Sequence, residues 1–511
     1  MPGEADVRCM SAPTEPDAAY DELTDRYARI ANVGKALGVL NWDQQVMMPD
    51  EGTPARSGQL STLSAVRHDL LTDPELGELL DAAEAGDLTD DQAAVVREIR
   101  YEHERAARVP ETLIEELTRT QSEAQEVWQD ARANDDFEHF APTLTELRDL
   151  HVRRAEHIDR DRDPFDVMYD DSERDLPIET VEAIFDQIRT ELIPLVEKIE
   201  KRGDDLPQPF EHAAPYDPDE QQALHGDALD RLGFDRDRAR LDTSPHPFTS
   251  GNQFDTRITT RVDESDPIDG LMSTIHEFGH ATYQLGLPQD HYANPLGESR
   301  SSGVHESQSR FWENHVGRTK PFWEGFLPTF TEHFPDAEGV TAEAAYRAVN
   351  RIYPDNLIRV EADELTYHMH ILLRHEIGRS FVHGEIDVEE IPQVWNDRME
   401  EYLGVRPDSD ANGALQDIHW STGFAAFESY TIGSVLAAQL DHAMRQDLDD
   451  VDGLIREGEF EPIHEWMTEN VHSHGKQYRT DELIEEATGE PLTADYFVEY
   501  AREKFTDLYG L

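Results

Sequence analysis

The sequence predicts a mostly α-helical fold with a small β element, on three observations. Amphipathic runs rich in Ala, Leu, Glu and Arg recur along the 511 residues, with the spacing of helices that bury one face. The segment 241–264 differs, because its β-branched run FDTRITTRV at 254–262 indicates a hairpin or small sheet. No internal repeat or Gly/Ser linker divides the chain, so residues 16–511 are expected to form a single helical domain after a flexible N-terminal extension at 1–15.

The apolar periodicity places the expected helices along the chain. They run at about 17–36, 73–84, 88–133, 136–160, 178–201, 217–232, 266–285, 303–317, 342–377, 388–403, 411–445 and 479–508. Residues 160–171 predict an acidic loop, because the stretch is interrupted by proline.

The charge balance restricts the partners of the protein. Acidic residues outnumber basic ones by 109 to 45, which gives a formal net charge of −64. Nucleic acid and anionic membranes are bound through basic surfaces, so neither is an expected partner. An acidic, Lys-poor surface repels itself in dilute buffer, and molar salt screens that repulsion because the Debye length falls to about 3 Å at 1 M. A halophilic cytoplasm is therefore expected.

The cysteine content and the N-terminal sequence agree with a cytoplasmic location. The single cysteine, Cys9, excludes an intramolecular disulfide and suits a reducing compartment. The first residues lack the basic and apolar regions of a signal peptide, and Met10 is an alternative start. No stretch approaches the roughly 20 apolar residues of a membrane span.

The motif HEFGH at 276–280 indicates a metal site. On the helix expected at 266–285, which Gly286 can end, His276 and His280 are four residues apart and project from one face. Two neutral imidazoles suit zinc, and Glu277 beside them can act as general base for a metal-bound water. Chance supplies such a pattern in about one chain of this composition in ten, the alternative being two surface histidines on an acidic helix.

A third ligand would distinguish a metal site from two surface histidines, because a catalytic zinc takes three protein ligands and leaves one position open. Glu298 lies in a Gly/Pro/Ser-rich loop, whereas Glu306 opens an amphipathic helix. A helix is the more rigid platform for a ligand, so Glu306 is favoured over Glu298. For the oxyanion of a tetrahedral intermediate, the downstream segment offers His419 and Tyr430 as donors.

Five further segments resemble the signatures of one known family. They are HPF (His246–Phe248), DTRIT (Asp255–Thr259), HESQ (His305–Gln308), IRVEAD (Ile358–Asp363) and GALQDIHW (Gly413–Trp420), in this order. Together with HEFGH, they make the chain resemble the carboxypeptidase Taq family of zinc carboxypeptidases, over nearly its whole length.

The resemblance implies a large helical metallopeptidase fold with a deep, narrow active-site cleft, usually as a homodimer. It implies the removal of single residues from peptide C-termini with broad side-chain tolerance, supported by Zn²⁺ or Co²⁺. The family pattern assigns the metal to His276, His280 and Glu306 and the general base to Glu277. The wider superfamily uses a downstream His and Tyr on the oxyanion, an arrangement similar to His419 and Tyr430.

Binding of a peptide's terminal carboxylate calls for a bidentate Arg. Arg359 is the first candidate and Arg257 the second, with a structural ion pair as the alternative for either residue. His246 is a further substrate-binding candidate. Other residues are expected to line the cleft or support the ligands, namely His305, Gln416 and Asp417. The cluster YHMH (Tyr367–His370) is interpreted as helix packing rather than as a second metal site.

Two other functions use the same motif. An oligopeptidase would cut peptides internally with the same chemistry, and a metal-binding scaffold would not catalyse at all. The intact Glu277 disfavours the scaffold, because a structural site has no use for a general base.

Overall fold

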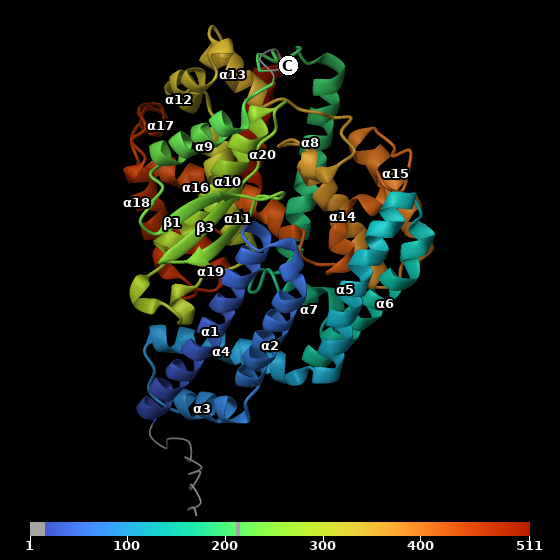
Figure 1. Ribbon diagram of the computed structural model, residues 1–511, viewed down its shortest axis with the longest axis vertical. Coiled ribbons are helices and arrows are strands. Elements are labelled where there is room, and N and C mark those ends of the chain that lie inside the picture. The colour runs from blue at the N-terminus through green and yellow to red at the C-terminus, as the bar shows by residue number, and fades with distance from the viewer. Residues whose placement is uncertain (1–15, 211–214) are drawn as a thin grey trace, which may run out of the picture. The chain divides into compact units, whose positions relative to one another are not determined.

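The structure is a computed structural model that describes residues 16–210 and 215–511 (Figure 1). The expected extension at 1–15, with Cys9 and Met10, lies outside the described residues. Helices dominate the described chain and one three-stranded sheet accompanies them, which confirms the predicted mostly α fold with a small β element. Packing of the backbone divides the chain into two compact units, so the single domain expected over 16–511 stays a prediction.

The smaller unit contains the chain up to Arg108, with 288–298 and 474–477. Its helices are α1 (Pro16–Val46), α2 (Thr53–Leu71), α3 (Pro74–Glu84) and α4 (Asp90–Arg108), with short turns η1 (Asp50–Gly52), η2 (Gln289–His291) and η3 (Pro295–Gly297). Its core is a separate apolar cluster in which Leu23, Leu80 and Ile99 are fully buried. α2 was not expected from the sequence, and α1 continues ten residues beyond the expected end at 36.

The larger unit contains the remaining elements and a single continuous apolar core. Its helices are α5 (Glu111–Asn134), α6 (Phe137–Ile158), α7 (Pro164–Tyr169), α8 (Ile178–Arg202), α9 (Pro218–Leu232), α10 (Pro267–Gly286), α11 (Ser302–Arg310), α12 (Lys320–His333), α13 (Ala342–Val349), α14 (Tyr367–Val382), α15 (Ile391–Leu403), α16 (Glu428–Asp447), α17 (Val451–Glu457), α18 (Glu461–Asn470), α19 (Thr480–Thr488) and α20 (Asp495–Tyr509). A π-helical segment, η4 (Phe311–Gly317), follows α11 directly.

Several expected helices are shorter or divided in the structure. The run at 88–133 breaks at Pro110, and the run at 479–508 breaks between α19 and α20 at Gly489 and Pro491. The expected helix at 342–377 is wrong between α13 and α14, where residues 350–366 form a loop that contains Pro354. Proline disfavours a helical conformation in the residue before it, and apolar spacing alone did not reveal these boundaries.

The sheet holds the strands β1 (Ala239–Thr243), β2 (Thr249–Asn252) and β3 (Asp255–Thr260), in the order β1-β3-β2. β2 and β3 form the expected antiparallel hairpin, and β1 adds to β3 in parallel, so that Ala239 lies opposite Thr256. Gly251 permits the tight hairpin, because a Cβ there would lie 2.1 Å from the carbonyl oxygen of Asp255. Strands β2 and β3 pack against α10, so the sheet supports the helix that carries HEFGH (Figure 1).

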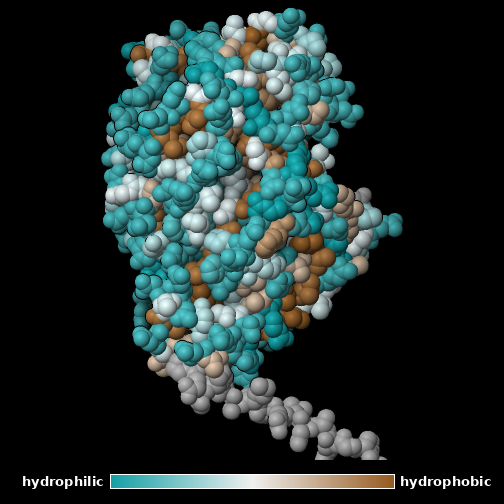
Figure 2. Space-filling model, turned by 90° about the vertical axis from the view of Figure 1, so that its left-hand side faces the viewer, coloured by the Kyte–Doolittle hydropathy of each residue, from teal (hydrophilic) through white to brown (hydrophobic). Residues whose placement is uncertain are grey.

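The face of the molecule drawn in Figure 2 is mostly polar. Hydrophilic residues cover most of the face drawn in Figure 2, with small scattered groups of hydrophobic ones. None of the helices in the described ranges is both long and apolar enough to cross a membrane.

Candidate metal centre

Helix α10 presents the motif HEFGH from a buried, well-capped position. The Asp266 carboxylate accepts hydrogen bonds from the backbone N–H groups of Ile268 and Asp269, which caps the N-terminus. Leu271, Ile275 and Phe278 are almost fully buried on its apolar face. Each such side chain contributes about 1.5–3 kcal/mol by its burial. This packing fixes the rotation of α10 and therefore the direction in which both histidines project.

Two glycines bring the Glu306 helix, α11, close to its neighbours. A Cβ on Gly279 would lie 2.5 Å from the carbonyl oxygen of Gln308, so α10 and α11 cross in near contact at this residue. A Cβ on Gly433 of α16 would lie 2.4 Å from Cγ of Glu306. Side chains at either position would push α11 away, so the close approach that the metal centre needs depends on both glycines.

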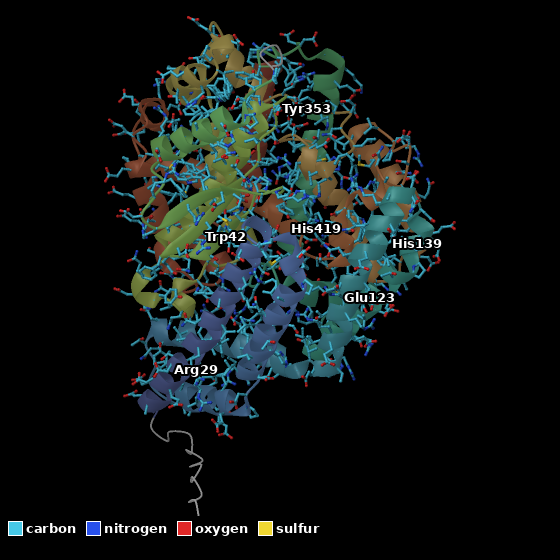
Figure 3. The ribbon with its side chains drawn as sticks, in the orientation of Figure 1. Arg29, Trp42, Glu123, His139, Tyr353 and His419 are labelled. Carbon is cyan, nitrogen blue, oxygen red and sulfur yellow. The ribbon has the colours of Figure 1, made fainter. Side chains whose placement is uncertain are left out.

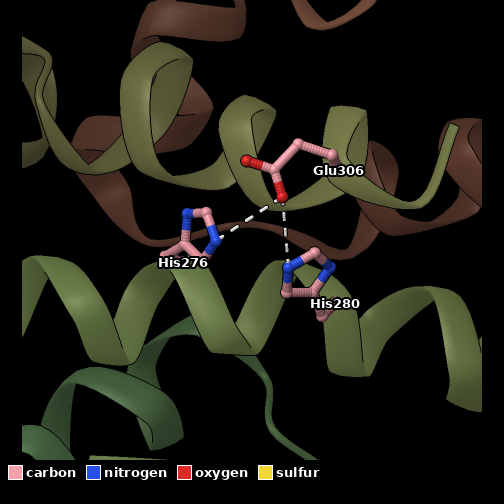
Figure 4. A group of neighbouring side chains, drawn as sticks. All are labelled: His276, His280 and Glu306. Carbon is pink, nitrogen blue, oxygen red and sulfur yellow. Dashed lines mark ion pairs between the residues drawn. The ribbon is translucent and has the colours of Figure 1, made fainter. Parts of the chain in front are cut away.

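The three predicted ligands meet at one point (Figure 4). The Nε2 atoms of His276 and His280 lie 3.7 and 3.4 Å from Oε2 of Glu306, and the three ligand atoms lie within 4.8 Å of one another. Tetrahedral ligands at about 2.1 Å from a metal are separated by about 3.4 Å, so the donor set and its spacing fit such an ion. Among the described residues, this is the one group of three or more potential ligands that is close enough to hold a metal.

The two histidines are oriented by different partners. Nδ1 of His276 lies 2.9 Å from Oε2 of Glu313, a carboxylate that fixes the ring with Nε2 facing the metal position. Nδ1 of His280 lies 2.7 Å from Nδ1 of His305. If His280 donates there, His305 accepts at Nδ1 and carries its proton on Nε2, which lies 3.0 Å from the Gln284 amide. That amide must then face His305 with its oxygen.

Glu313 belongs to a buried network of charges. It forms ion pairs with Arg318 at 2.9 Å and with Arg310 at 3.3 Å, and Arg310 is also 2.8 Å from Glu306. Burial raises the pKa of Glu313, but Arg318 and the hydrogen bond to His276 outweigh it and hold the pKa well below its usual range. The carboxylate therefore stays ionised behind His276. Glu313 lies in the π-helical segment, a geometry that often occurs at functional sites.

The predicted base, Glu277, is held by the sheet. The hydroxyl of Thr249 on β2 donates to Oε2 of Glu277 at 2.6 Å, and Glu277 is largely buried. The β element therefore contacts the HEFGH motif directly, through a residue that follows the HPF segment.

A cavity of about 670 Å³ opens over this centre. His276, Glu277 and Glu306 line it, together with Tyr430 and five arginines. These arginines are Arg261, Arg310, Arg318, Arg351 and Arg359. Guanidinium groups beside the metal position give the cavity the chemistry to bind an anionic substrate group.

Arg359 lies nearly buried between aromatic rings in this cavity. Its guanidinium lies 5.1 Å from the Phe427 ring centre, 3.4 Å from the Tyr367 hydroxyl and 3.7 Å from Oδ1 of Asp417. Burial raises the pKa of Tyr430 well above its usual value, so this neighbouring hydroxyl stays protonated and can donate a hydrogen bond.

His419 (labelled in Figure 3) is fixed by the same carboxylate that lies beside Arg359. Its Nδ1 donates to Oδ1 of Asp417 at 2.7 Å, and Asp417 also accepts from the buried Arg374 at 3.0 Å. Burial raises the pKa of Asp417, but the His419 hydrogen bond and Arg374 together hold it below its usual range. The His419 side chain is 41 % exposed, so its other face is open to solvent.

His419 and several other predicted residues lie outside the lining of the cavity. Arg257 on β3 makes a bidentate ion pair with Asp255, at 2.7 and 2.9 Å. His246 is exposed in the turn before β2, although the adjacent Pro247 lines the cavity. Glu298, the less favoured candidate for the third ligand, forms an ion pair with Lys476 at 3.0 Å in the smaller unit.

The structure also places the YHMH cluster and Gln416. In YHMH, His368 and His370 are buried in α14, and neither belongs to the metal-binding group. Gln416 accepts a hydrogen bond from the backbone N–H of Arg359 at 2.8 Å and thereby supports the IRVEAD segment.

Sequence reasoning missed Thr249, Arg310 and Glu313. A spacing of four residues places Arg310 on the same helical face as Glu306, and this signal was available. Glu313 was harder to find, because the π-helical segment changes the helical phase after Arg310. Thr249 contacts Glu277 only through the packing of the sheet on α10.

Comparison with known proteins gives one consistent result. The family model of the carboxypeptidase Taq (M32) metallopeptidases matches residues 22–505. The thermostable carboxypeptidase 1 of Pyrococcus furiosus is 38% identical over 491 residues, covering 95% of this chain and 98% of the relative. The protein of the same name from Thermus thermophilus is 36% identical, covering 97% of this chain and 100% of the relative.

A solved structure shows the same fold. The M32 carboxypeptidase from Deinococcus radiodurans R1 superposes with a TM-score of 0.93 at 37% sequence identity, over 97% of this chain and 100% of that one.

Proposed function

The chain belongs to the carboxypeptidase Taq family of metallopeptidases and is a carboxypeptidase, and from this premise we propose that it uses zinc and Glu277 to release single residues from peptide C-termini with broad specificity. The observation that carries the proposal is the convergence of His276, His280 and Glu306 at separations that suit a tetrahedral ion, beside Glu277. The family implies a metal, and two imidazoles with one carboxylate are a zinc donor set, which Co²⁺ can also occupy.

The residues divide the chemistry between them. Zinc, when bound, supplies a Lewis acid that polarises the scissile carbonyl and acidifies the attacking water. Glu277 accepts the proton from that water and later delivers it to the leaving amine. Tyr430, protonated and lining the cavity, donates a hydrogen bond to the developing oxyanion, and His419 assists from the Asp417 side.

We assign to Arg359 the binding of the substrate's terminal carboxylate. It lines the cavity, its guanidinium is pre-oriented on aromatic rings, and its Asp417 neighbour is 3.7 Å away rather than in a tight bidentate pair. Arg257 remains the second candidate, although its guanidinium already forms a bidentate pair with Asp255. In addition, Arg257 does not line the cavity.

Matched peptides test the proposal. A blocked dipeptide with a free C-terminus is expected to be hydrolysed, and its C-terminal amide is expected to resist. Equal turnover of both would contradict carboxypeptidase specificity and favour an internally cutting oligopeptidase. Chelation should abolish turnover, and Zn²⁺ or Co²⁺ should restore it.

A substitution at Glu277 tests the mechanism. The variant E277Q should retain bound metal, because the three ligands are intact, and should lose hydrolysis. Metal analysis and turnover on the same sample decide this, and surviving turnover would exclude Glu277 as the base. Homodimer formation and a cytoplasmic location also stay predictions, the first of which light scattering at molar salt would check.

A further inference from the structure

The short helix that carries Glu306 is held at its N-terminus by a segment far away in sequence. In any α-helix the first N–H groups have no acceptor within the helix. In α11, the N–H of Ser302 donates to the carbonyl oxygen of Ser172 at 3.0 Å, and the N–H of Gly303 donates to Oε1 of Glu173. The N–H of Val304 donates to Oγ of Ser301 at 3.3 Å. Two of these three donors therefore depend on residues 172 and 173.

Glu173 is fully buried, so its carboxylate meets the N–H of Gly303 away from solvent. The fit is tight, because a Cβ on Gly303 would lie 3.0 Å from Oε1 of Glu173 and 2.5 Å from Cγ2 of Ile432. The first turn of α11 is thus enclosed between Glu173 and α16. Loss of the Glu173 acceptor deprives a buried backbone N–H of its hydrogen-bond partner.

The segment that bears Glu173 is itself anchored. The backbone N–H groups of Ser172 and Glu173 donate to the carbonyl oxygen of Tyr169 at the end of α7, at 3.0 and 2.9 Å. Two residues further on, Asp175 lies 3.5 Å from the guanidinium of Arg300, which precedes α11. Residues 172–175 therefore hold both the residues that precede α11 and its first turn, through hydrogen bonds and an ion pair.

From these contacts we propose that Glu173 is a positioning residue of the metal centre, setting the position of Glu306 through the N-terminus of α11. Glu306 lies three residues after Gly303, on the turn that Glu173 caps, and α11 has only nine residues in which to absorb a displacement. Glu173 does not line the cavity over the metal centre, so it would act on the centre through α11. The proposal rests on Glu306 being a ligand, which belongs to the proposed function.

The test compares three substitutions in the full-length protein at molar salt, with Zn²⁺ affinity measured by competition with a chelator. E173A removes the acceptor and should weaken Zn²⁺ binding about 10–100-fold, the range for partners behind metal ligands. E173Q keeps an oxygen near Gly303 and should stay within about threefold of the wild type. E173D keeps the carboxyl group but withdraws its oxygen from Gly303, so it should bind Zn²⁺ more weakly than E173Q.

Two controls make the result decisive. D73A removes a comparable cap, in which Asp73 accepts from the N–H of Glu75 at the start of α3 in the smaller unit, and it should lower the melting temperature without changing Zn²⁺ affinity. E306Q should abolish tight Zn²⁺ binding; if it does not, Glu306 is not a ligand, and the proposed function fails together with the inference that rests on it.

The outcomes for Glu173 are then unambiguous. Loss of affinity in E306Q with none in E173A would overturn the positioning role. If E173A does not fold, the order of E173D and E173Q decides, and tighter Zn²⁺ binding by E173D than by E173Q would overturn it.

Discussion

The hydroxyl of Thr249 lies 2.6 Å from Oε2 of Glu277, and this hydrogen bond links the small sheet to the proposed base on α10. Hydrogen bonds to a charged group contribute about 1.5–3 kcal/mol, and 1.4 kcal/mol corresponds to a factor of ten. The sheet is therefore expected to affect catalysis, although it supplies no metal ligand.

Replacing Thr249 by Val should lower kcat about tenfold or more and leave metal content unchanged, because the base loses its orientation and the three ligands do not. Steady-state kinetics with metal analysis would measure this. T249S keeps the hydroxyl and should retain most of the activity. An unchanged kcat in T249V would show that Glu277 is positioned by other contacts.

The variant E313Q should weaken metal binding about 10–100-fold, because the partner that orients His276 loses its charge. Buried Arg310 and Arg318 also lose their ionised partner, so the melting temperature should fall. Chelator competition below the melting temperature separates the two effects. Wild-type affinity in a destabilised E313Q would restrict Glu313 to a structural role.

A methyl group at Gly433 should also damage the metal centre. In G433A the new Cβ would lie 2.4 Å from Cγ of Glu306, so α11 or α16 must shift and metal affinity should fall. Gly58 within α2 is the matched control, because nothing lies within 4 Å of its Cβ position. G58A should stabilise the protein by about 0.5–1 kcal/mol, the usual gain for replacing a helical glycine.

The two candidate carboxylate-binding arginines can be separated by substitution. R359A should lower kcat/KM for free-C-terminal substrates about 30-fold or more, since loss of a buried charged contact costs about 2–5 kcal/mol. R257A should change kcat/KM little, because Arg257 is paired with Asp255 outside the cavity lining. The opposite ranking would move the carboxylate site to β3.

Glu173 should make stability depend on pH near neutrality. Burial raises its pKa to about 7 from 4.5, with Glu428 adding to the effect and the Ser429 hydroxyl opposing it. Folding thus favours the neutral form, and that stabilisation is present below about pH 4.5 and lost as pH rises through 7. E173Q stays neutral, so between pH 5 and 8 its unfolding free energy should fall by about 3 kcal/mol less than that of the wild type. Parallel denaturation curves would contradict this.

Salt should stabilise the protein, because the formal net charge is −64. The free energy of unfolding is expected to rise from dilute buffer to molar KCl as self-repulsion is screened. Sucrose at matched osmolality is the control, since it raises stability by exclusion from the surface without screening charge. Equal stability in dilute buffer and in molar KCl would contradict the halophilic prediction.

The sequence by itself determined the helical class and the small β element beside HEFGH, and it predicted Glu306 rather than Glu298 as the third ligand. These features follow from local periodicity and from the reach of side chains on one helix, which spacing reveals. Helix boundaries were less accessible, as the loop between α13 and α14 shows, because a short apolar run fits both a helix and the packed loop at its end.

Only the tertiary structure decided which residues support the metal centre. Glu313, Thr249 and Glu173 reach it from a π-helical segment, a strand and a distant turn, and no sequence spacing encodes such approaches. The physical reason is that α11 can approach α10 and α16 only where Gly279 and Gly433 remove a Cβ. Both glycines can be read from the sequence. Which atoms of the neighbouring helix lie against them is known only from the packed structure.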